Sequence, residues 1–275
     1  MTCCLKLLLI GSGAWGKNYI KTLQNFDIEL SVANRYNWKQ LIDKKPNGVI
    51  VCTPPQFHTE IARYSLEYNI PTMIEKPLSL SLEDAKSLNG FSAPILVNHI
   101  HLFSEQYENI KKKISVNNIT HISSQGFNIG PYRDYSSLWD YGPHDLSMIL
   151  DILGRTPDLV NANKYITNNG AMYSIDMTFG KITTKSLVGN GGSFKQRLLS
   201  IDSHQKFVYD DSIPSKTKPL SNALEVFIKS INGGHDYRLG LDLSFMIIDI
   251  LERCSKKCEI LGINNRQSQL SYKIS

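Results

Sequence analysis

The segment from Leu138 to Leu146 contains residues that can transfer a proton. His144 follows Asp140 by four positions, and Pro143 lies between them. Proline is favoured at the first position of a helix, so the sequence predicts a helix beginning near Pro143, with His144 in its first turn and Asp140 just ahead of it. Both side chains can then face one cleft. A histidine beside a carboxylate is a candidate acid or base near neutral pH.

A glycine-rich turn close to the amino terminus indicates a second kind of chemistry, the binding of phosphates. The apolar run Leu5–Ile10 is followed by the pattern GxGxxG, which in a βαβ unit binds a dinucleotide. The amide hydrogens of the next helix would face the phosphates, and the helix dipole favours their negative charge. The candidate cofactor-binding residues of this turn are Gly11, Ser12, Gly13, Ala14, Trp15 and Gly16.

The residues after the second expected strand bear on the choice of cofactor. Dinucleotide domains usually place an acidic residue there, about 20 residues past the first glycine, to bind the adenosine ribose. This chain has Asn34 and Arg35 instead. Without a carboxylate a 2′-phosphate is not repelled, and Arg35 can pair with it or stack on adenine. We therefore expect NADP in preference to NAD, while a plain surface arginine remains the alternative.

Two further segments follow predicted strands. Thr53, Pro54, Pro55 and His58 come after one strand, and Glu75-Lys76-Pro77 comes after the next. Open α/β sheets bind their ligands at the carboxyl ends of the strands. Two prolines stiffen the first loop, which can then lie along a nicotinamide ribose.

The first hundred residues alternate short apolar runs with amphipathic segments. This pattern is typical of a parallel sheet covered by helices on both faces, a Rossmann-type domain. After residue 100 the pattern changes, and residues 159–209 alternate in the manner of antiparallel hairpins, broken by glycine and asparagine. We expect two domains: residues 1–100 for NAD(P), and residues 101–275 as an α+β domain with an open, mainly antiparallel sheet for substrate binding and oligomerisation.

Composition excludes several classes of protein. The net charge of +5 is spread along the chain, which argues against nucleic-acid binding. No apolar stretch approaches the roughly 20 residues needed to span a bilayer, so we expect no membrane partner and a cytoplasmic location. Five cysteines do not indicate a disulfide framework. Cys254 and Cys258 lack the two further ligands of a zinc site, so no metal is expected.

Four motifs occur in order along the chain: GSGAWGKNY, CTPPQFH, EKPL and WDYGPHDL. Together they resemble the glucose-fructose oxidoreductase / inositol dehydrogenase / MocA (Gfo/Idh/MocA) family, most of all its branch that acts on sugars and nucleotide-linked sugars. The resemblance runs over essentially the whole length. It implies that Lys76 lies near the nicotinamide and the reacting hydroxyl, that His144 transfers the proton, and that Asp140 is its neighbour in the sugar site.

The resemblance also implies substrate contacts at Asn128, Tyr132 and Arg133, and a homodimer or homotetramer formed through the second sheet. The expected activity is NAD(P)-dependent oxidation of a secondary hydroxyl of a sugar or nucleotide sugar, or reduction of the matching keto sugar. One alternative is a catalytically inactive dinucleotide-binding regulator or scaffold of the same fold. Another is an enzyme of this fold with a different substrate, such as a biliverdin-type or imine reductase.

Overall fold

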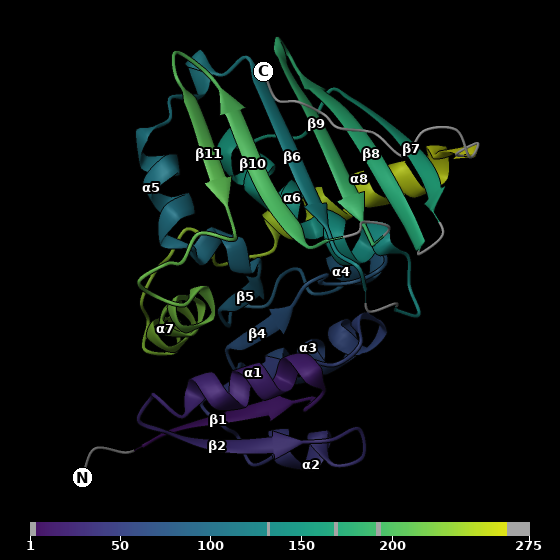
Figure 1. Cartoon of the computed structure of the whole chain (residues 1–275). Helices are drawn as coiled ribbons and strands as arrows, with labels where there is room; N and C mark the ends of the chain where they lie inside the picture. Colours follow the sequence, from purple (N-terminus) through teal and green to yellow (C-terminus); the bar gives the residue numbers. More distant parts are fainter. Residues whose placement is uncertain (1–3, 131–132, 168–169, 191–193, 263–275) are drawn as a thin grey trace.

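The computed structural model describes residues 4–130, 133–167, 170–190 and 194–262 (Figure 1). Its first sheet has five parallel strands in the order β2-β1-β3-β4-β5. The middle strands are buried along most of their length, so apolar residues occupy both faces. This confirms the predicted doubly wound sheet. The strands are β1 (Leu5–Ile10), β2 (Ile28–Ala33), β3 (Gly48–Val51), β4 (Thr72–Glu75) and β5 (Ile95–Asn98).

Helices connect these strands as the sequence predicts. They are α1 (Ala14–Leu23), α2 (Trp38–Ile42), α3 (His58–Glu67), which follows the short 3₁₀ turn η1 (Pro55–Phe57), and α4 (Leu82–Lys86). The strand order reverses direction between β1 and β3, which lie side by side. The loops that leave these two strands therefore diverge and form a crevice, the usual ligand position in such sheets.

The second sheet has seven strands in the order β11-β10-β6-β9-β8-β7-β12. Four of the six pairings are antiparallel, while β6 with β9 and β7 with β12 are parallel. The predicted open, mainly antiparallel sheet is confirmed. Its strands are β6 (His121–Phe127), β7 (Leu159–Thr167), β8 (Gly170–Phe179), β9 (Ile182–Gly189), β10 (Gln196–Asp202), β11 (Lys206–Asp210) and β12 (Glu259–Gly262).

Helices α6 (Ser137–Leu153) and α8 (Asp242–Lys257) cover one face of this sheet (Figure 1). Gly142 allows them to approach closely, because a Cβ there would lie 2.9 Å from the side chain of Leu251. Further elements of this half are the 3₁₀ turns η2 (Ile100–Phe103) and η3 (Val116–Asn118) and the helices α5 (Glu105–Lys113) and α7 (Pro219–Ile231).

The predicted start of the helix near Pro143 is wrong. Helix α6 begins at Ser137, and the Ser136 side chain accepts a hydrogen bond from Leu138 N at 3.2 Å as its N-cap. Pro143 lies inside the helix, at the cost of one backbone hydrogen bond. Burial of Leu138, Trp139 and the apolar residues that follow offsets this cost.

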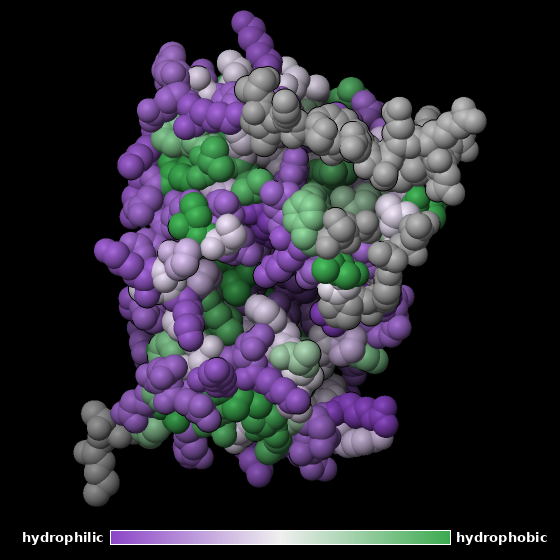
Figure 2. Space-filling model, in the orientation of Figure 1, coloured by the Kyte–Doolittle hydropathy of each residue, from purple (hydrophilic) through white to green (hydrophobic). Residues whose placement is uncertain are grey.

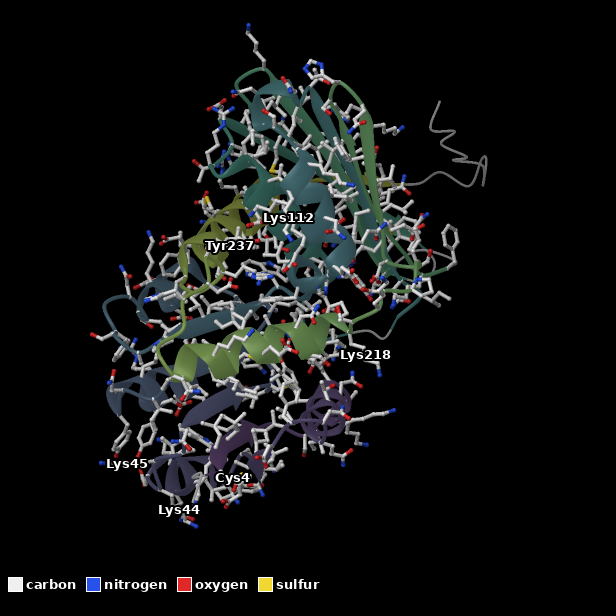
Figure 3. The ribbon with its side chains drawn as sticks, turned by 90° about the vertical axis from the view of Figure 1, so that its left-hand side faces the viewer. Cys4, Lys44, Lys45, Lys112, Lys218 and Tyr237 are labelled. Atoms are coloured by element: carbon white, nitrogen blue, oxygen red, sulfur yellow. The ribbon has the colours of Figure 1, made fainter. Side chains whose placement is uncertain are left out.

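Helix α7 belongs to the second half of the chain but packs against the first sheet. A Cβ on Gly48 of β3 would lie 2.7 Å from Ile231 and 3.1 Å from Phe227, so the helix lies directly against this strand. Figure 3 shows α7 running along the parallel sheet from Lys218 at its start. A domain boundary at residue 100 stays a proposal. Helix α7 lies after that residue in the sequence but packs on the sheet that comes before it.

The helices of the described segments include none that is both long and apolar enough to cross a membrane.

Candidate active site

The glycine turn between β1 and α1 has the shape that a dinucleotide requires. Gly11 has φ +102°, and a Cβ there would lie 2.4 Å from Cys52 O. A Cβ on Gly16 would lie 2.2 Å from Gly11 O, so only glycine lets α1 start this close to the turn. Gly13 faces open space. No side chain caps α1 and no acidic residue lies in its first turn, so its amide end is open to a phosphate.

The residues after β2 form an exposed turn beside the end of β1. Asn34 Oδ1 accepts from Tyr36 N at 2.8 Å, and Asn34 N donates to Asn37 Oδ1 at 2.9 Å. The Arg35 guanidinium lies over the Tyr36 ring, 4.6 Å from its centroid, and donates to the Tyr36 hydroxyl. Arg35 is thus held at the sheet edge where the adenosine end of a dinucleotide is expected.

His58 connects the loop after β3 to the loop after β4. Its Nε2 lies 2.7 Å from Thr53 O and its Nδ1 2.9 Å from Pro77 O, and the side chain is 1% exposed. Burial lowers the pKa of His58, so the imidazole is neutral at pH 7 and one nitrogen donates. The neutral ring donates to one of these two carbonyl oxygens and lies close to the other, so His58 fills the space between the two loops. Pro54 and Pro55 lie between β3 and α3, with Pro55 beginning η1.

Glu75 is the buried centre of a hydrogen-bond network behind these loops. Its Oε1 accepts from Trp15 Nε1 at 2.6 Å, Tyr19 Oη at 2.5 Å and Asn98 Nδ2 at 2.7 Å. Burial raises the pKa of Glu75, against the opposing effect of these donors. Glu75 directly precedes Lys76, so its bond to Trp15 ties the glycine turn to the loop that carries Lys76.

Lys76 and Asp140 form a close ion pair between the two halves of the chain. Lys76 Nζ lies 2.8 Å from both Asp140 Oδ1 and Asp140 O, and Arg133 Nε lies 3.4 Å from Asp140 Oδ2. Burial raises the pKa of Asp140, but Lys76 and Arg133 more than offset this and hold it below its usual range. An ammonium fixed on a carboxylate at the carboxyl end of β4 can stabilise charge on a substrate oxygen.

His144 lies one helical turn beyond Asp140 on α6, and within the described segments the Lys76 ammonium donates to Asp140 rather than to His144. Its Nδ1 is buried without a hydrogen-bond partner there. Burial lowers the pKa of His144, and the nearby charges of Lys76 and Arg197 lower it further. The imidazole is therefore neutral at pH 7 and can accept a proton.

Figure 2 shows a hollow between the lower part of the molecule, which holds the first sheet, and the upper part, which holds the second. Lys76 extends from the first part and Asp140 from the second. Among the described residues, no group of three histidine, cysteine, aspartate or glutamate side chains lies close enough to hold a metal ion.

A family comparison agrees with this geometry. Residues 20–90 match the GFO_IDH_MocA model, described as an oxidoreductase family with an NAD-binding Rossmann fold. Among curated proteins no sequence matches significantly.

Solved structures share the fold of this chain at low sequence identity. UDP-N-acetylglucosamine 3-dehydrogenase from Acidithiobacillus ferrooxidans has a TM-score of 0.83 and 16% identity, with 94% of this chain and 99% of that chain covered. Myo-inositol 2-dehydrogenase from Lactobacillus plantarum gives 0.76 and 16%, with 93% and 97% covered. GenD2 from gentamicin A biosynthesis, solved in complex with NAD, gives 0.82 and 14%, with 94% and 95% covered.

The substrate residues expected from the Gfo/Idh/MocA resemblance lie at the end of β6 and beyond it. Asn128 N donates to Gly189 O at 3.2 Å, and its side chain accepts from Ile129 N at 2.8 Å. Arg133 is about half exposed while its Nε reaches Asp140, so its remaining donors can meet a ligand. Tyr132 lies outside the described residues.

Sequence reasoning missed a group of buried residues around His144. His99 and His101 lie on either side of the start of η2, and the His101 ring packs edge to face on His144, 4.9 Å between centroids. Arg197 of β10 pairs with the fully buried Asp145. The spacing His-x-His just after β5 could have indicated these residues, because open α/β sheets bind their ligands at the carboxyl ends of the strands.

Proposed function

We propose that the protein is an NAD(P)-dependent oxidoreductase that oxidises a secondary hydroxyl of a sugar or nucleotide sugar, or reduces the matching keto sugar. The observation that carries the proposal is the contact of Lys76 Nζ with Asp140 at 2.8 Å, with His144 one turn further along α6. Three polar groups of the predicted types near the carboxyl end of a dinucleotide-type sheet support the proposal.

The proposed reaction divides between hydride and proton. A nicotinamide held at the glycine turn would supply the hydride chemistry, and the side chains of this protein would handle the proton. His144 accepts the proton that leaves the hydroxyl oxygen, so that a carbonyl forms, and returns it in the reverse direction. Lys76 stabilises negative charge on that oxygen, and Asp140 holds the ammonium in place through its carboxylate and its carbonyl oxygen.

For the cofactor, the family supports a nicotinamide dinucleotide, and we propose NADP in preference to NAD. The support is the exposed Arg35 beside the end of β1, in a turn without a carboxylate at positions 34 to 37. A guanidinium binds a phosphate through charge-assisted hydrogen bonds.

A homodimer or homotetramer and a cytoplasmic location remain predictions. The support for self-association is the second sheet, which α6 and α8 cover on one face only (Figure 1). An open sheet face suits association with a second copy of the same sheet.

The proposal is tested by screening nucleotide sugars, free sugars and their keto forms for change in NAD(P)H fluorescence. On a substrate so found, Lys76→Ala and His144→Ala should each lower turnover by about 10²–10⁴-fold, because a positioned acid or base contributes that much. Lys206→Ala, at an exposed lysine of β11, is the control.

Turnover within about threefold of wild type in both variants would remove the assigned roles, since the expected loss is far larger. Dinucleotide binding without turnover of any substrate in the screen would support the inactive regulator instead.

A further inference from the structure

A line of polar side chains leads from His144 to the surface of the second sheet. The His101 ring packs against His144 at an angle of 80°. His101 Nδ1 lies 2.8 Å from Tyr209 Oη, and Tyr209 Oη lies 3.5 Å from Asp211 Oδ1. His101 and Tyr209 are buried, whereas Asp211 is partly exposed beside Lys195.

The order of donors along this line determines where the His101 proton sits. A carboxylate only accepts, so a Tyr209 hydroxyl that donates to Asp211 leaves its oxygen to accept from His101 Nδ1. Asp211 Oδ1 also lies 3.9 Å from His101 Nδ1, which favours a hydrogen on that nitrogen. Both contacts indicate that neutral His101 carries its hydrogen on Nδ1.

Positive charges surround the two imidazoles, so the charge of His101 affects how easily His144 takes up a proton. His144 faces Lys76 from the loop after β4, Arg197 from β10, and His99 and His101 from the end of β5. The Lys76 charge is paired with Asp140 and the Arg197 charge with Asp145. Burial lowers the pKa of His101, with Arg197, Lys195 and Lys76 lowering it further. A charged His101 would oppose proton uptake by its neighbour.

We propose that His101 is a positioning residue for His144, and that Tyr209 and Asp211 set its tautomer. The edge-to-face contact fixes the plane of the His144 ring, and the hydrogen bond of Nδ1 to Tyr209 prevents His101 from rotating. The inference rests on the proposed role of His144, although the tautomer can be measured independently of it.

The test is ¹H–¹⁵N correlation spectroscopy of the imidazoles in the full-length protein, without cofactor or substrate. Signals are assigned with His101→Gln and His144→Gln. We expect wild-type His101 as the Nδ1–H tautomer, and Tyr209→Phe should shift the ring nitrogens of both His101 and His144. Asp211→Asn, at a partly exposed position, tests the same tautomer if Tyr209→Phe does not fold.

Tyr107→Phe is the matched control. Tyr107 is a buried tyrosine whose ring lies 6.3 Å from that of Tyr209, and its hydroxyl donates to Asp151 at 2.6 Å. Tyr107→Phe removes a hydroxyl oxygen, as Tyr209→Phe does, but this hydroxyl bonds Asp151 and not His101. An Nε2–H tautomer in the wild type, or equal shifts of His144 in both tyrosine variants, would overturn the proposal.

Kinetics separate this proposal from the proposed function. With a substrate in hand, Tyr209→Phe should lower kcat by at least about tenfold and leave KM within about twofold, because a misoriented base acts on the chemical step and not on binding. An unchanged kcat would overturn the positioning role. If no substrate is found, the proposed function fails, while the spectra still decide the tautomer.

Discussion

Glu75 links the residues that would hold the cofactor to those that would handle the substrate. One carboxylate oxygen accepts from Trp15 of the glycine turn, and the other accepts from Lys76 N at 3.2 Å. Burying a carboxylate costs less free energy when several donors bond to it, and Tyr19 and Asn98 also donate to Glu75. The position of Lys76 therefore depends on the same residue that fixes Trp15.

At Arg35 the structure allows a direct test of cofactor choice. Arg35→Ala should weaken NADPH binding by about 10–100-fold, because a hydrogen bond between charged groups contributes about 1.5–3 kcal/mol. NADH binding should change by less than about threefold, since NADH lacks the 2′-phosphate. Dissociation constants from cofactor fluorescence measure both.

Arg63→Ala, at an exposed arginine of α3, is the control for general loss of positive charge. Equal weakening of NADH and NADPH binding by Arg35→Ala would contradict the preference for NADP.

The residues that the sequence identified and those it missed differ in a physical way. Lys76 and Asp140 belong to motifs with recognisable neighbours, and the structure brings them together. His101 and Tyr209 are 108 residues apart, and Tyr209 reaches η2 from β11, the edge strand that pairs with β10. Such a contact depends on tertiary structure, so the spacing of residues in the sequence cannot predict it.

At the scale of elements, the early start of α6 changes how the site is built. With the helix beginning at Ser137, Asp140 lies in its first turn, where the helix dipole favours a negative charge. His144 then follows at i+4 on the same face. The proline that suggested a helix start lies within the helix, because an apolar face large enough to bury overrides a local preference.

The junction of β1 and α1 gives a prediction with two readouts. Gly16→Ala should lower the free energy of unfolding by about 1–3 kcal/mol, because its Cβ meets Gly11 O at 2.2 Å. It should also abolish measurable dinucleotide binding. Gly13→Ala faces open space, so it should alter stability by at most about 1 kcal/mol while still weakening binding, because its methyl group occupies the expected phosphate position.

Urea unfolding and cofactor titration of both variants measure these effects. Full dinucleotide affinity in Gly13→Ala would show that the phosphates lie elsewhere.

At the scale of the whole molecule, buried neutral histidines couple stability to pH. Burial lowers the pKa values of His58, His101 and His144, and it lowers that of His99 to about 3. In the unfolded chain a histidine titrates near its ordinary value of about 6.5. The unfolded state therefore binds more protons below that pH, and stability falls as the pH falls.

The free energy of unfolding should accordingly decrease between pH 6.5 and 5, by up to about 1.4 kcal/mol per pH unit for each such histidine. His99→Gln should reduce the slope, and His235→Gln, at an exposed position, should not. Urea midpoints across this range give the slope, and a flat profile would contradict the burial of neutral imidazoles.

Much of the overall architecture could be predicted from alternation of apolar runs, because period and strand length are local properties. The return of α7 could not, since nothing in residues 219–231 specifies which surface their apolar face will cover. Leu220, Leu224 and Phe227 indicate an amphipathic helix, and the partner is decided by the whole chain.

Because α7 packs on β3, the first sheet is covered by a helix from the last quarter of the sequence. A protein cut after residue 100 would leave β3 exposed where Phe227 and Ile231 now lie. The first sheet is thus completed by a segment synthesised more than a hundred residues later, so during translation this sheet must wait for the rest of the polypeptide before that flank is closed.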